Sequence, residues 1–133
     1  MLNLKFGNKE LNVAFAYEPT LKSRLLSKLA KMTTNAEEQD FESVENMLLF
    51  LPEMLLIGLQ KHHKEYAFNF DTKEGYEQRL EETFALISEY IDDEGNDAIE
   101  LSNMLQEELM KNGFLKKMFE NELEKAENSN KKK

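Results

Sequence analysis

Residues 47–59 read MLLFLPEMLLIGL, which is the longest apolar stretch of the chain. Its apolar side chains cover nearly the whole circumference of a helix and leave a narrow polar strip near Asn46, Glu53 and Gln60. A helix that is apolar on all sides must be buried on all sides, which is hard to arrange in a chain of 133 residues. The stretch is therefore either a central core helix or a helix with one face left for a partner or a second copy.

The first fifteen residues have the alternation of a β-hairpin. In LNLKFGNKELNVAF, residues 2–15, apolar and polar side chains alternate on both sides of Gly7-Asn8. A two-residue loop pairs position 6 with 9, 4 with 11 and 2 with 13, so one face is apolar. Because an isolated hairpin is marginal in water, this face must pack on the rest of the chain.

The remaining segments have helical periodicity and predict a mainly α fold. The expected helices cover 19–32, 41–64 with a kink or a new start at Pro52, 73–93, 97–111 and 114–123. Capping boxes are expected at Thr34 with Glu37 and at Asp97 with Glu100. We expect one compact domain over 1–126, with a hairpin at 1–16, a helical body of about five segments at 19–126 and a disordered basic tail at 127–133.

The charge is unevenly distributed along the chain. The net charge is −9; residues 1–35 carry +4 and the last three lysines carry +3, which leaves −16 for residues 36–127. Such an acidic body repels phosphates, so we expect no sequence-independent nucleic-acid binding. The chain has 0 Cys and neither a signal-peptide pattern nor a membrane-spanning stretch, which is typical of a cytosolic protein.

Residues that carry catalytic or metal chemistry are scarce. His62 and His63 are adjacent and point in different directions on a helix, so we expect two exposed polar residues rather than metal ligands. A calcium loop starting at Asp92 has Asp97 where glycine is required and Asn103 where glutamate is required, so a helix–helix turn is the better interpretation. With no phosphate loop or nucleophile motif, we expect no enzyme activity, no cofactor and no metal.

Methionine and aromatic side chains, which are common at protein–protein contacts, are frequent instead. The chain has Met 7, Phe 9 and Tyr 4, mostly on the expected helices. Core packing is the expected role of most of the aromatic rings. A minority, together with residues 47–59, would line a groove for an amphipathic helix, since methionine is flexible and common in such grooves.

The order of these features resembles the tail assembly chaperones of long-tailed phages that infect Gram-positive bacteria. The resemblance covers most of residues 1–120, namely the hairpin LNLKFGNKELNVAF, the helix TLKSRLLSKLAKM, the apolar MLLFLPEMLLIGLQ and the late segment LSNMLQEELMKNGFLKKMF. Pro52 inside the apolar helix departs from the family pattern.

The resemblance implies a non-enzymatic protein that keeps the apolar, helical tape measure protein soluble during tail assembly, as a homo-oligomer. It implies action in the cytoplasm of the infected host and absence from the mature virion. The client would bind the apolar side chains Phe41, Met47, Phe50, Leu51, Met54 and Leu55. Contacts between copies would use the basic side chains Arg24, Lys28 and Lys31.

Two alternatives stay open. An acidic mimic of nucleic acid that inhibits a host DNA-binding protein would use the −16 of residues 36–127, and its binding would weaken with salt. A structural subunit would be found in the finished virion. The acidic mimic does not explain a helix that is apolar on all sides.

Overall fold

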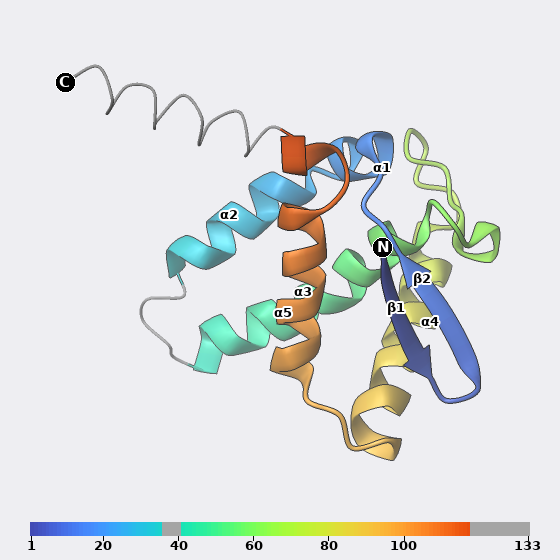
Figure 1. Ribbon diagram of the computed structural model, residues 1–133, viewed down its shortest axis with the longest axis vertical. Helices are drawn as coiled ribbons and strands as arrows, with labels where there is room; N and C mark the ends of the chain where they lie inside the picture. Colours follow the sequence, from blue (N-terminus) through green and yellow to red (C-terminus); the bar gives the residue numbers. More distant parts are fainter. Residues whose placement is uncertain (36–40, 118–133) are drawn as a thin grey trace.

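The computed structural model describes residues 1–35 and 41–117, in which a hairpin precedes a helical body (Figure 1). The elements are β1 (Leu2–Phe6), β2 (Lys9–Val13), α1 (Tyr17–Lys22), α2 (Leu25–Asn35), α3 (Phe41–Leu59), the 3-10 turn η2 (Lys64–Tyr66), α4 (Tyr76–Ser88), the π-helical turn η3 (Glu89–Asp93) and α5 (Ala98–Lys111). Residues 114–117 are also helical. The mainly α fold class, with an N-terminal hairpin and one compact domain, is confirmed.

The hairpin has the expected register. Leu2 pairs with Val13, Leu4 with Leu11 and Phe6 with Lys9. Gly7 has a φ of 62°, as the first residue of a two-residue hairpin loop requires. The apolar face is buried, with Leu11 3% and Val13 0% exposed.

The hairpin packs on α3 through a close backbone approach. The amide of Ala14 donates to the carbonyl of Gly58 over 2.9 Å. A Cβ at Gly58 would lie 2.6 Å from Val13 Cγ1 and 3.2 Å from Phe15 Cζ, so this contact has no room for a side chain. The absence of a side chain at position 58 therefore lets β2 lie directly against the core helix.

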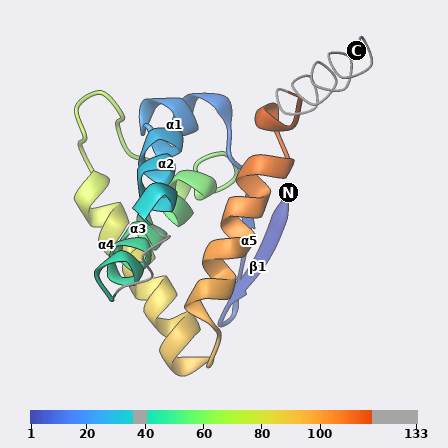
Figure 2. The same cartoon turned by 90° about the vertical axis from the view of Figure 1, so that its left-hand side faces the viewer.

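The second half of α3 forms the centre of the core. Every residue from Met54 to Leu59 is buried, and α4, α5 and β2 pack around this half. In Figures 1 and 2, α5 crosses α3 while the N-terminal half of α3 extends beyond it, alongside α2. The second half of α3 therefore agrees with the interpretation of residues 47–59 as a central core helix.

Pro52 neither ends α3 nor starts a new helix, since α3 continues through it to Leu59. Its missing N–H leaves the carbonyl of Leu48 without its usual helical donor. Leu48 is 37% exposed, so this carbonyl lies in the half of the helix that water reaches. The expected end at Lys64 was wrong, because residues 60–63 form a turn before η2.

The single helix expected over 19–32 was also wrong. The chain forms α1 and α2, separated at Ser23 and Arg24, and Arg24 has a φ of 57°. Such a conformation costs an arginine roughly 1–2 kcal/mol. It turns the chain so that Thr20 and Leu25, both 0% exposed, can face the core together.

The start of α4 and both ends of α5 lie at a capping residue or beside a glycine with a positive φ. Asp97 Oδ1 accepts from the amides of Ile99, at 2.8 Å, and Glu100, at 3.4 Å, so the N-cap half of the expected capping box is confirmed. α5 ends at Lys111, before Gly113 with its φ of 72°. The helix expected to start at 73 begins at Tyr76, after Gly75 with its φ of 83°. Thr34 lies within α2, whereas Glu37, its expected partner in a capping box, the end of the last helix and the tail 127–133 lie outside the described residues.

Replacing Gly58 by alanine tests the close approach of β2. We expect Gly58→Ala to lower the free energy of unfolding by roughly 1–3 kcal/mol in a urea titration, because the added methyl group overlaps Val13. The double variant Gly58→Ala with Val13→Ala should lose less than the two single losses combined, since Val13 Cγ1 is the overlapped atom. A gain in stability from Gly58→Ala would show that helix propensity outweighs the contact and would contradict this account.

Candidate functional site

The N-terminal half of α3 carries an apolar surface open to water. Phe41 is 94% exposed, Val44 36%, Leu48 37% and Leu49 55%. We call these four residues the α3 strip. A single exposed apolar residue is ordinary, whereas four large ones on consecutive turns of one helix mark a contact surface.

The predicted client-binding residues divide between this surface and the core. Phe41 belongs to the α3 strip, and Met47 is half-buried beside it. Phe50 is 8% exposed, and the remaining three are core residues: Leu51, Met54 and Leu55, at 1%, 1% and 0%. A client therefore reaches Phe41 and Met47, but not the other four, in this structure.

Sequence reasoning missed Val44, Leu48 and Leu49. The signal was the placement of charge, because Glu42 and Glu45 interrupt the first half of α3, whereas the second half contains Glu53 alone. Alternating glutamates favour an exposed half-helix, while an uninterrupted apolar run favours a buried one. The interpretation of residues 47–59 as one apolar segment therefore missed the boundary near Phe50, where the exposed part of α3 ends and the buried part begins.

The three bases predicted for self-association have different surroundings. Arg24 and Lys31 are exposed, and neither forms an ion pair with another residue in the described ranges. Lys28 instead donates to the carboxylate of Glu53 on α3, whose side chain is 16% exposed. Lys28 therefore joins α2 to α3 within one copy.

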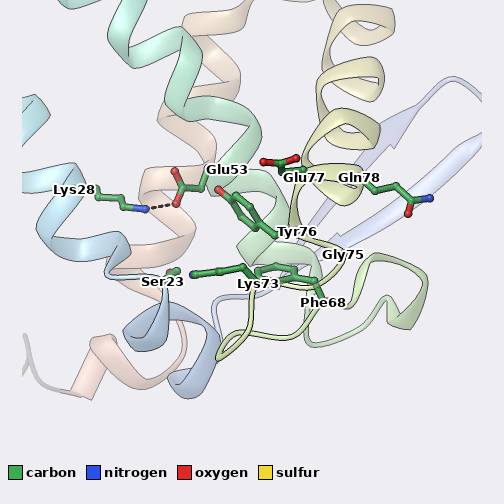
Figure 3. A pocket seen from close by; sticks show the side chains of 9 residues that line it. All are labelled: Ser23, Lys28, Glu53, Phe68, Lys73, Gly75, Tyr76, Glu77 and Gln78. Carbon is green, nitrogen blue, oxygen red and sulfur yellow. Dashed lines mark hydrogen bonds and ion pairs between the residues drawn. The ribbon is translucent and has the colours of Figure 1, made fainter.

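A cavity of about 600 Å³ lies between α2, α3 and the start of α4 (Figure 3). The Lys28–Glu53 ion pair forms one side and the Tyr76 ring the other. Lys73 Nζ lies 5.5 Å from the centre of the Tyr76 ring, in a cation–π contact. Its lining consists of Ser23, Lys28, Glu53, Phe68, Lys73, Gly75, Tyr76, Glu77 and Gln78.

Lys28, Glu53, Lys73 and Tyr76 each have a partner within the lining of this cavity. Burial raises the pKa of Tyr76 to about 12, with further contributions from the negative charge of Glu53 and a hydrogen bond to it. The phenol thus keeps its proton at neutral pH and holds α4 to α3. Because Lys28 and Lys73 also have partners, we interpret the cavity as a polar link between three helices.

His63 has a structural role that the sequence did not indicate. Its side chain is 13% exposed, Nε2 accepts from the amide of Asn12 at 2.9 Å, and Nδ1 lies 3.1 Å from Glu65 Oε1. The expectation that both histidines are exposed was therefore wrong for His63, because β2 packs over the turn that follows α3. The turn expected after Asp92 is confirmed, and Gly95 has a φ of 74° there.

The Tyr76 link predicts a pH dependence of stability. Because its folded-state pKa lies above the ordinary value of 10.0, the link stabilises the fold fully below about pH 10 and loses its effect as the pH rises through about 12. In urea titrations at about pH 9 and about pH 11, Tyr76→Phe should lose less stability between the two values than the unchanged chain does. In an absorbance titration, Glu53→Gln should move the last tyrosine ionisation to lower pH. An identical pH profile for Tyr76→Phe and the unchanged chain would contradict this role.

Within 1–35 and 41–117, no group of three or more His, Cys, Asp or Glu side chains could hold a metal ion. No helix in these ranges is long and apolar enough to cross a membrane. No protein-family model matches the chain, and no curated protein or solved structure is significantly similar to it.

Proposed function

We propose that this protein is a tail assembly chaperone that binds the apolar helices of a tape measure protein and keeps them soluble. The observation that carries the proposal is the α3 strip, which is open on a domain whose core is otherwise well packed. A half-helix that leaves four large apolar side chains in water is suited to cover another apolar surface.

The dimensions of the α3 strip favour one helix as its client. From Phe41 to Leu49 the strip extends roughly 12 Å, at 1.5 Å per residue. This length matches the apolar stripe of about two turns of a partner helix, with contacts at every third or fourth residue. One copy would therefore cover a short piece of the client, and several copies along it would be needed for tight binding.

The order of elements also supports the proposal, since the hairpin, the following helices and the apolar α3 occur where the resemblance to the tail assembly chaperones expects them. A net charge of −9 would keep copies and complexes apart from one another in solution. Self-association through Arg24, Lys28 and Lys31 stays a prediction, and a light-scattering mass above 15.6 kDa for the free chain would support self-association itself.

Co-expression with a helical tape-measure fragment from the same genome tests the proposal. We expect the fragment to be soluble with the unchanged chain and mostly insoluble with Leu49→Asp, because a charge replaces an apolar side chain of the α3 strip. The matched control is Ile99→Asp on α5, where the side chain is 50% exposed compared with 55% at Leu49. Because Leu49→Asp can no longer bury a leucine side chain against the client, its affinity for the client should fall by roughly tenfold or more.

The outcomes separate the alternatives. A soluble complex that resists high salt supports apolar contact, whereas one that dissociates with salt points to the acidic mimic. Recovery of the chain in purified particles would indicate a structural subunit. An insoluble fragment with the chain free in the supernatant would contradict the proposed function.

A further inference from the structure

Two carboxylates lie among the four apolar side chains of the α3 strip. Helical geometry places Glu45 between Leu48 and Leu49, and Glu42 next to Leu49. Both glutamates are exposed, so Glu45 lies near the middle of the face that water reaches. A helix that covers the strip must cover or border these two carboxylates as well.

No cation of the described chain neutralises them. α3 contains no Lys or Arg in its 19 residues, and neither glutamate takes part in an ion pair within 1–35 and 41–117. On the neighbouring helices, Lys28 is engaged with Glu53, and Arg79 is engaged with Glu82 at 2.9 Å. The exposed Arg24 and Lys31 form no ion pair with either glutamate in the described ranges. The negative charge of the strip is therefore left for a partner to match.

Covering a carboxylate without a partner is unfavourable, because the group loses its water and gains no donor. A purely apolar helix would bear this cost at Glu45 and Glu42, and an acidic helix would add repulsion. A helix with Lys or Arg beside its apolar stripe would instead form ion pairs at the edge of the contact. Basic flanks would also speed the encounter with so acidic a body.

We propose that the α3 strip selects amphipathic helices whose apolar stripe is flanked by Lys or Arg. This inference rests on the proposed function and names the class of helix that the same site binds. Glu45 and Glu42 act as the selecting groups, while the four apolar side chains supply contact area.

Three synthetic helical peptides with one apolar stripe and Lys, Gln or Glu flanks test the selection by fluorescence anisotropy at physiological salt. The unchanged chain should bind the Lys peptide about tenfold more tightly than the Gln peptide, as two partly exposed ion pairs would give. The Glu peptide should bind weakest. The double variant Glu42→Gln with Glu45→Gln should bind the Lys and Gln peptides equally.

The matched control is Asp92→Asn with Asp93→Asn, which removes the same charge from exposed positions on η3. It should keep the preference for Lys. Equal binding of all three peptides, or an equal loss of preference in both double variants, would overturn the inference and leave the proposed function standing. Binding of no peptide would overturn both. A light-scattering mass for the free chain that falls on Leu49→Asp would assign the strip to a second copy and overturn the inference.

Discussion

Burial of the second half of α3 on all sides is the constraint on which the rest of the structure depends. Leu55, Leu56 and Ile57 are 0% exposed, so other elements must cover every face of the helix there. β2 covers one face at backbone distance because Gly58 has no side chain, and α4 and α5 cover others. A chain of 133 residues has little further material with which to surround a helix of this length.

This limit accounts for the exposed first half of the same helix. The boundary lies near Phe50, one turn before Glu53, where the polar link of Lys28, Glu53 and Tyr76 joins α2, α3 and α4. Before this boundary the helix contains Glu42 and Glu45 among its apolar residues, and after it every residue except Glu53 is buried. One helix thus provides both the centre of the core and the surface that we propose for a client.

The sequence predicted features that depend on neighbours along the chain. The hairpin register followed from alternation around Gly7-Asn8, and the start of α5 followed from Asp97, because both signals are local. The positive φ of Arg24 was not predictable, since it results from the joint burial of Thr20 and Leu25. Leu49 is exposed and Leu55 buried because of what packs around each, and the sequence signals this difference only through the glutamates near Leu49. The role of His63 was likewise not predictable, since its partner Asn12 is 51 residues away in the sequence.

Thiol labelling at position 49 shows whether the client covers the α3 strip, since the chain has 0 Cys and any introduced thiol is unique. Leu49→Cys and the matched variant Ile99→Cys would be reacted with a thiol reagent with and without the tape-measure fragment. We expect fast labelling at both positions in the free chain and strong protection at position 49 alone in the complex. Equal labelling at position 49 with and without the fragment, in a complex that has formed, would contradict the assignment of the client to the α3 strip.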